Sequence, residues 1–278
     1  MGWRVKISHV TRFDYDGSAS ASYNEVRMTP LSDRGQTTLE RRLVVRPSAP
    51  VWTYTDHWGT IVGVFDLPAP HRSLTIESYA RVDTSAAPPL GVPSARDDLR
   101  AAGGPVGELL RPTPQTAISP GLAADARERA EGLDAHEAAE ALAWHVNERI
   151  AYVPGATGVR TSAQEVWEHG KGVCQDMAHL TVALLRAADI PARYVSGYLH
   201  PRPEAEIGEA VAGQSHAWIE YWTGEWNALD PTNRTRGGEA HVVVGRGRDY
   251  TDVPPIKGVY QGMVSGRQEV VVEVVRLA

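Results

Sequence analysis

Cysteine is nearly absent from this 278-residue sequence, in which Cys174 is the single one. A lone cysteine excludes an intrachain disulfide framework and every zinc or iron–sulfur site that needs several cysteines. The histidines include no His-x-x-x-His pair, and no calcium loop rich in Asp and Asn is present. We therefore expect neither a metal nor any other cofactor.

The chain also lacks a long apolar run and an excess of basic residues. No apolar stretch approaches the ~20 residues that span a bilayer, and residues 1–7 do not form the apolar segment of a signal peptide. Lys and Arg number 28 against 34 Asp and Glu, and this net charge of -6 argues against nucleic acid as a partner. We expect a cytoplasmic protein that binds neither nucleic acid nor membranes. The sequence does not indicate its oligomeric state.

The N-terminal part of the chain is rich in strand patterns. Apolar residues make up 42% of the sequence, and a chain of this length can bury a full hydrophobic core. Residues 3–7 and 74–82 alternate with a period of two, which is typical of strands with one buried face. Residues 85–94 (SAAPPLGVPS) resemble a linker. We predict an N-terminal antiparallel β region over residues 1–85, packed on the core or paired with a C-terminal strand near residues 270–275.

Residues 95–278 mix helical and strand patterns and form the predicted core. Capping-box spacings begin helices at residues 134–137 and 162–165, and Gly170 is a typical helix end. A third helix is predicted from Cys174 to a stop before Pro191. Strand patterns follow at residues 193–199, 215–222, 225–229 and 269–277. This mixture predicts an α+β fold.

The cysteine lies at the predicted first turn of a helix, after a loop that contains glycine. A helix N-terminus offers free N–H groups and partial positive charge, and both favour the thiolate form of Cys174. A free cysteine is also commonly a small buried hydrophobic residue. Its position alone does not separate a nucleophile from a core residue.

A predicted hairpin supplies partners for this cysteine. Its two strands flank Thr223-Gly224, and a three-residue loop over residues 222–224 would place His216 directly opposite Asp230. A two-residue loop would put them on opposite faces of the sheet. A lone strand histidine is otherwise an ordinary packed or surface residue, but a carboxylate in register favours an oriented imidazole.

Cys174, His216 and Asp230 together are the parts of a thiol acyl-transfer site. The thiolate attacks a carbonyl carbon, His216 accepts and returns the proton, and Asp230 orients the imidazole. Backbone N–H groups at the helix start would stabilise the oxyanion.

These residues stand in recognisable motifs. The sequence resembles the bacterial transglutaminase-like family, which has a papain-like core with a nucleophile helix packed on an antiparallel sheet, and residues 1–85 resemble the β-rich region that precedes this core. The resemblance implies that Cys174, His216 and Asp230 are catalytic. The stretches that carry it are Gly172-Val173-Cys174-Gln175-Asp176-Met177-Ala178-His179-Leu180, Ser215-His216-Ala217-Trp218, Asp230-Pro231-Thr232-Asn233, residues 152–157 and residues 247–255.

Further residues are candidates for the oxyanion hole and the substrate cleft. Related enzymes often complete the oxyanion hole with an upstream side chain, and the sequence does not choose among the candidates. Asp176 fits a first-turn helix carboxylate better than a catalyst. The segment at residues 248–250 either folds over the cleft or forms a structural turn. The candidates are Tyr152, Gln164 and Trp167 upstream, with a core role also open for Trp167, the backbone of Gln175, and Trp218 and Tyr250 as cleft walls.

The expected function is amide acyl transfer through a thioester on Cys174, with a peptide or protein amide as substrate. We expect hydrolysis, as in a cysteine protease or amidase, because nothing in the sequence identifies an amine site. Protein-glutamine cross-linking by a transglutaminase reaction is the alternative enzyme function. A noncatalytic module that holds a peptide in the cleft is the alternative of another class.

Overall fold

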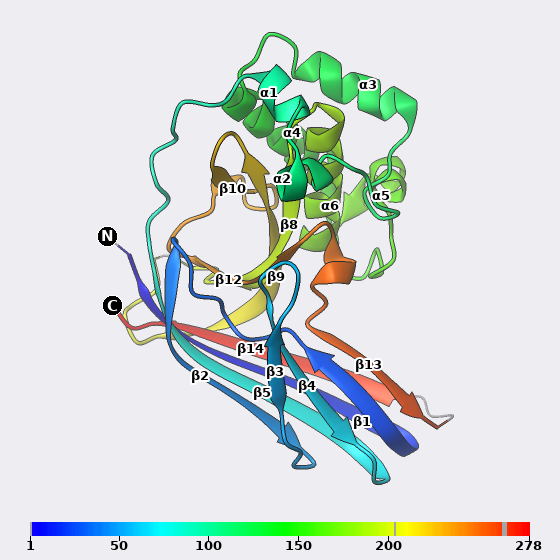
Figure 1. Cartoon of the computed structure of the whole chain (residues 1–278). Coiled ribbons are helices and arrows are strands. Elements are labelled where there is room, and N and C mark those ends of the chain that lie inside the picture. Colours follow the sequence, from blue (N-terminus) through cyan, green and yellow to red (C-terminus); the bar gives the residue numbers. More distant parts are fainter. Residues whose placement is uncertain (1, 203, 263–265) are drawn as a thin grey trace.

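A computed structural model describes residues 2–202, 204–262 and 266–278 of the chain. A largely antiparallel sheet and a group of helices occupy separate layers (Figure 1), so the predicted α+β class is confirmed. No helix among these residues is both long enough and apolar enough to cross a bilayer. The strands are β1 (Arg4–Val26), β2 (Gln36–Arg46), β3 (Trp52–Thr55), β4 (Ile61–Leu67), β5 (His71–Thr84), β6 (Ala151–Tyr152), β7 (Lys171–Gly172), β8 (Ala192–Leu199), β9 (Ala210–Trp222), β10 (Trp226–Asp230), β11 (Thr235–Arg236), β12 (His241–Gly247), β13 (Ile256–Gln261) and β14 (Gly266–Arg276). The helices are α1 (Arg96–Arg100), α2 (Gly104–Glu108), α3 (Pro120–Arg129), α4 (Ala135–Arg149), α5 (Ala163–His169), α6 (Cys174–Ala187) and the 3-10 turn η1 (Tyr250–Asp252).

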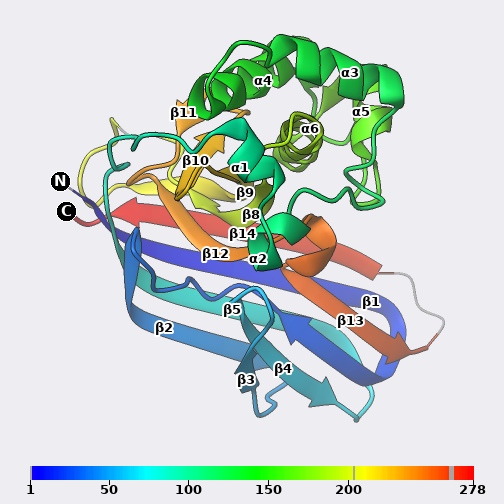
Figure 2. The ribbon, with the colours of Figure 1, turned by 45° about the horizontal axis from the view of Figure 1, so that its top comes forward.

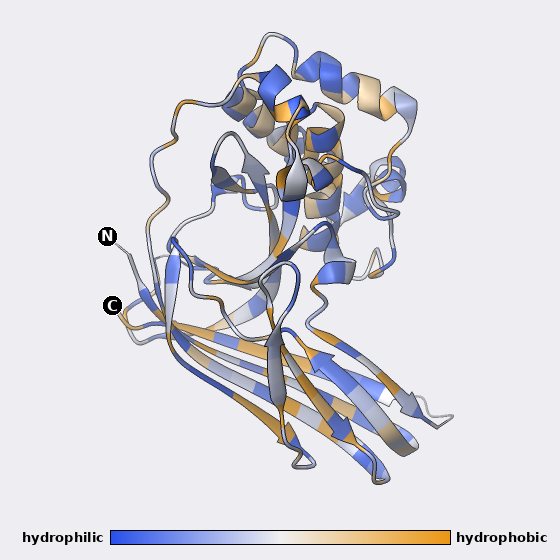
Figure 3. Cartoon of the chain, viewed as in Figure 1, coloured by the Kyte–Doolittle hydropathy of each residue, from blue (hydrophilic) through white to orange (hydrophobic). Residues whose placement is uncertain are grey.

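Strand β1 is the centre of the N-terminal sheet. Its first half pairs antiparallel with β5 on one edge and with β14 on the other, and β2 extends the sheet beyond β5. Val5 and Ile7 point into the buried face whereas Arg4 and Lys6 are exposed. The same alternation appears as bands of opposite hydropathy along the strands in Figure 3. The predicted period-two strands of this region are therefore confirmed.

Strand β14 joins the N-terminal sheet to the core. It pairs with β1 from Gly266 to Arg276, and its other edge pairs with β9 at residues 210–213. The predicted pairing of N-terminal strands with residues 270–275 is confirmed. Strand β9 is longer than predicted, because its first residues belong to this junction. Beyond residue 213 it continues into the core, where it pairs with β8 and β10.

Helix α6 is the central element of the helical layer (Figure 2). It packs on β8 and β9 and is surrounded by α3, α4 and α5. All its side chains from Asp176 to Arg186 are buried, as expected for a helix enclosed on every side. The predicted capping boxes form at Asp134 and Ser162, and Gly170 ends α5 in the left-handed conformation (φ +66°).

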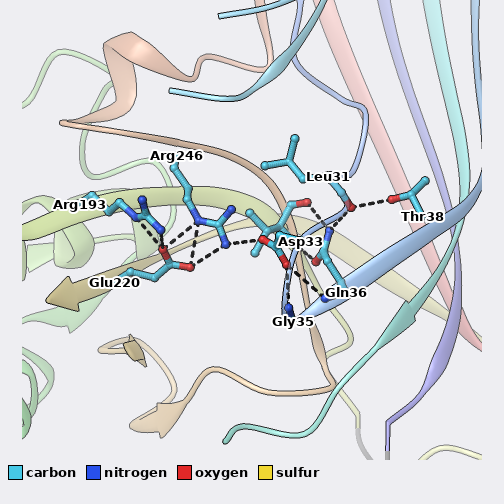
Figure 4. A network of polar contacts seen from close by, with 9 residues as sticks. Leu31, Asp33, Gly35, Gln36, Thr38, Arg193, Glu220 and Arg246 are labelled. Carbon is cyan, nitrogen blue, oxygen red and sulfur yellow. Dashed lines mark hydrogen bonds and ion pairs between the residues drawn. The ribbon is translucent and has the colours of Figure 1, made fainter. Parts of the chain in front are cut away.

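An ion-pair network that is buried at Glu220 ties the core strands to the N-terminal region (Figure 4). Glu220 of β9 accepts hydrogen bonds from Arg193 of β8 (2.6 Å) and Arg246 of β12 (2.9 Å). Arg246 also donates to Asp33 (2.7 Å), and the Gln36 side chain bonds the backbone of β12. Burial alone would raise the pKa of Glu220, but the charges of Arg246 and Arg193 outweigh it and lower the pKa to about 2.

The junction of β1, β14 and β9 can be tested at two adjacent residues. Val274 is buried in it, whereas Glu273 is exposed. Val274→Asp puts an unpaired carboxylate into this packing and should lower the free energy of unfolding by about 3 kcal/mol, measured by urea denaturation. Glu273→Ala is the control and should change it by less than about 0.5 kcal/mol. Equal effects of the two variants would contradict a stabilising junction.

Candidate functional site

The loop before α6 places Cys174 at the first position of the helix. Asp176 is fully buried, and its Oδ2 accepts hydrogen bonds from the Val173 N–H (2.7 Å) and the Thr157 hydroxyl (2.5 Å). A side chain at Gly172 would lie 2.8 Å from Cβ of Asp176, so glycine allows the chain to approach the helix. Burial raises the pKa of Asp176, and these two hydrogen bonds partly oppose the shift. Asp176 thus shapes the helix start, as its sequence position indicates.

The hairpin that carries His216 and Asp230 has a different register from the predicted one. Trp222 pairs with Trp226, so the three-residue turn begins at Thr223, one residue later than expected. The Asn227 side chain closes this turn by donating to the Thr223 hydroxyl (3.0 Å), and Gly224 supplies the positive φ of +102°. The predicted direct opposition of His216 and Asp230 is therefore wrong.

The two residues nevertheless meet, because a shift by two positions preserves the face of the strand on which a side chain lies. They are diagonal neighbours, and His216 Nε2 lies 2.7 Å from Asp230 Oδ2. The expected contact forms through a different pairing of the two strands.

Asp230 is a fully buried carboxylate with five hydrogen-bond donors around it. Oδ1 accepts from the backbone N–H groups of Thr232 (3.0 Å) and Asn233 (3.1 Å). Oδ2 accepts from the Asn233 amide (2.7 Å) and from two imidazoles, His216 and His241 (3.2 Å). Burial alone would raise the pKa of Asp230, but the hydrogen bonds from the two imidazoles outweigh it and hold the pKa far below its usual range. Asp230 is therefore ionised.

His216 connects Asp230 to the cysteine. Its Nε2 faces Asp230, so Nδ1 is the nitrogen left to interact with the side chain of Cys174. Burial would lower the pKa of His216, but hydrogen bonds and charge interactions with Asp230 and Cys174 raise it to about 9. Cys174 itself is half-buried. His216 is therefore an imidazolium at neutral pH, placed beside the sulfur of Cys174.

His241 is a member of the site that the sequence analysis missed. Its Nδ1 accepts from the Gly238 N–H (3.4 Å), so Nε2 carries the hydrogen that it donates to Asp230. Among the described residues, His216, Asp230 and His241 are the one group whose possible metal-ligand atoms lie within 4.8 Å of one another. Hydrogen bonding accounts for that proximity. The sequence offered no signal for this role, because His241 lies on β12, which was not predicted.

A cavity of about 640 Å³ opens beside Cys174 and His216. Gln175 and Tyr250 line it, as expected, together with Tyr194 of β8. The Tyr250 N–H donates to Nε2 of His179 (3.0 Å), whose pKa burial lowers to about 4, so His179 is neutral. Tyr250 therefore borders the cavity, and the segment at residues 248–250 forms a fixed turn.

Two other candidates, Trp218 and Gln164, lie elsewhere. Trp218 does not line the cavity as expected: it is buried under His216 (ring centroids 6.0 Å apart) and against His241. Gln164 also lies outside the cavity lining, because its side chain accepts from the Ser119 N–H and donates to Glu168.

The remaining upstream candidates, Trp167 and Tyr152, have different surroundings. Trp167 packs against the helical core beside His145 and Arg149, which agrees with the core-packing role left open by the sequence. Tyr152 is about half exposed. Tyr152 does not line the cavity; burial raises its pKa, and the charge of Cys174 adds a smaller contribution.

Comparison with protein families agrees with this architecture. Residues 122–231 match the Transglutaminase-like superfamily, and residues 5–83 match the Bacterial transglutaminase-like N-terminal region. An uncharacterized protein of Mycobacterium leprae is 42% identical over 278 residues, covering 99% of this chain and 100% of the relative. The chain belongs to the transglutaminase-like superfamily, with the N-terminal region found in its bacterial members.

Two further matches bear on fold and chemistry. The crystal structure of "a Putative Cysteine Protease from Cytophaga hutchinsonii" superposes with a TM-score of 0.82 at 22% identity, covering 100% of this chain and 92% of that one. It shows the same fold. The Protein-glutamine gamma-glutamyltransferase of Pseudomonas aeruginosa is 31% identical over 128 residues, covering 42% of this chain and 19% of that protein.

The charge state of His216 gives a direct test. Asp230→Asn removes the main charge that raises the pKa of His216, so its titration midpoint, followed by NMR of labelled histidine, should fall from about 9 toward or below 6.5. Folding raises this pKa, so the stability that His216 contributes is complete below pH 6.5 and is lost as the pH rises through about 9. This dependence should vanish in the variant. An unchanged midpoint would contradict the contact between His216 and Asp230.

The hydrogen bond from His241 to Asp230 gives a second prediction. His241→Phe keeps a ring against Trp218 but removes one donor from the buried carboxylate of Asp230, which should lower the free energy of unfolding by about 1–2 kcal/mol. With fewer donors on Asp230, the titration midpoint of His216 should also rise. A loss of stability without that rise would show that His241 only packs.

Proposed function

We propose that the chain hydrolyses peptide or amide bonds of a peptide or protein substrate through a thioester on Cys174. The observation that carries this proposal is the interaction of Cys174 with His216, whose other ring nitrogen lies 2.7 Å from the ionised Asp230, at the edge of a cavity of about 640 Å³. Cavities of 300–1,000 Å³ accept ligands of the size of a short peptide segment.

The reaction follows from the positions of these groups. The thiolate of Cys174 attacks the carbonyl carbon, a C–S bond forms, and the carbonyl electrons move to the oxygen. The N–H groups of Cys174 and Gln175 have no partner within the first turn of α6, so they are suited to stabilise that oxyanion. His216 gives its proton to the leaving amine as the C–N bond breaks. It then takes a proton from water, which attacks the thioester. The C–S bond breaks, the acid is released, and the thiolate of Cys174 is regenerated beside the imidazolium of His216.

The lining of the cavity favours water rather than an amine as the nucleophile that attacks the thioester. Its described lining contains no Asp or Glu that would recognise a lysine ammonium group. Gly266, Gln268 and Val270 line it and are exposed, so solvent reaches the cavity from this side. Transamidation needs an amine held near the thioester with water excluded.

Two alternatives remain in view. The name of the Pseudomonas aeruginosa relative favours transamidation of glutamine side chains as the second candidate. A noncatalytic peptide-binding module is the third, and the ionised Asp230 beside His216 argues against it because packing alone does not require that charge.

Whether water or an amine attacks the thioester decides between hydrolysis and transamidation. A glutamine-containing peptide and an ordinary peptide amide are each incubated with and without a millimolar dansylated amine, and products are identified by mass. Release of free acid should exceed amine incorporation. Asp230→Asn should lower turnover by about ten- to a thousandfold, and Cys174→Ala should abolish it. Predominant amine incorporation would favour the transglutaminase reaction, and turnover that survives in Cys174→Ala would exclude the thioester.

A further inference from the structure

The cavity at Cys174 extends well beyond the proposed reacting groups, onto the N-terminal sheet. Four alternate residues of β1 line it: His9, Thr11, Phe13 and Tyr15. Alternate residues of β14 line it beside them, because Thr11 pairs with Val270, Phe13 with Gln268 and Tyr15 with Gly266. One face of the paired strands β1 and β14 is thus continuous with the site. At ~3.3 Å per residue, the distance from His9 to Tyr15 corresponds to about six residues of extended peptide.

Strand β13 forms the opposite wall of this cavity, through Ile256, Gly258 and Tyr260. It pairs with the second half of β1, beyond the bulge near residue 20. At the end remote from Cys174, the rings of Tyr15 and Tyr260 lie 5.3 Å apart. Two neighbouring aromatic rings with their edges and faces in contact form a surface suited to a further aromatic or apolar group. We call the face formed by β1, β13 and β14 the β groove.

The β groove is almost without charge. His9 is buried, and burial lowers its pKa to about 4, so it is neutral. It is held between the Tyr198 hydroxyl (2.9 Å) and the Thr11 hydroxyl (3.1 Å). Among the described lining residues beyond Cys174 and His216, Arg267 is the one with a permanent charge, and it interacts with Asp14. A lysine side chain would therefore lose water in the groove without gaining an opposite charge, and an acidic one would meet only Arg267, which already interacts with Asp14.

We propose that the β groove determines substrate specificity by binding an extended peptide with neutral side chains, one of them an aromatic ring packed against Tyr15 and Tyr260. This inference rests on the proposed peptide hydrolysis for its substrate class. It assigns the N-terminal sheet a role in substrate binding in addition to its structural one. The peptide backbone passes from Cys174 along the face of β1 toward the two tyrosines.

Two adjacent valines provide matched variants. Val270 and Val271 are exposed to similar extents (48% and 54%), but Val270 faces the groove and Val271 the other side of the strand. Each is changed to Glu in the Cys174→Ala background, and binding of fluorescent peptides is measured by anisotropy. The peptides are neutral decamers that carry a single Phe, Lys or Glu, moved along the sequence. Thermal melting establishes that both variants are folded.

The expected result is tighter binding of the Phe peptides than of the Lys or Glu peptides, by about tenfold at one preferred position. Val270→Glu should weaken binding of the Phe peptides about tenfold and favour Lys instead, whereas Val271→Glu should leave all affinities unchanged. Equal effects of the two variants, or no preference for Phe, would overturn the proposal. If these peptides bind as expected but the wild-type chain cleaves none of them, the proposed hydrolase function is wrong, whereas the proposed peptide binding in the β groove is supported.

Discussion

The buried carboxylate of Asp230 is the interaction on which the candidate site depends. A charge removed from water is costly unless polar groups replace that water, and here five donors do so. Two come from the backbone just after β10, and the two imidazoles come from β9 and β12. Three strands must therefore be in place before the charge is stable, and the same arrangement holds His216 against Cys174. The stability of the sheet and the protonation of the site are thus linked.

The antiparallel sheet extends this linkage to the N-terminal region. Strand β9 pairs with β14 at its start and carries His216 further along, so the strand of the candidate site is hydrogen-bonded to a strand of the β groove. Glu220 on the same strand is fixed by two arginines, one of which reaches Asp33. The N-terminal region and the core are therefore held together by backbone pairing and by the ion pair between Arg246 and Asp33. This construction suits a binding surface whose position relative to Cys174 must not vary.

Local sequence patterns predicted much of this structure. Capping boxes, the glycine at residue 170 and the period-two strands each depend on neighbours in the sequence, and they formed as expected. The register of the hairpin was predicted wrongly, because the Asn227 side chain selects a later turn that residue spacing does not reveal. His241 and the β groove could not be predicted, since they arise from pairings between strands far apart in the sequence.

Strands β1 and β14 are neighbours in space although they lie near opposite ends of the sequence. During synthesis, the first strand is present long before its partner, and such non-local pairing is slow to form. A chain that stops before residue 266 already contains Cys174, His216 and Asp230, but it leaves one edge of β1 open, and open edges promote aggregation. The sheet that supports the candidate site is therefore complete only after the last strand has been made.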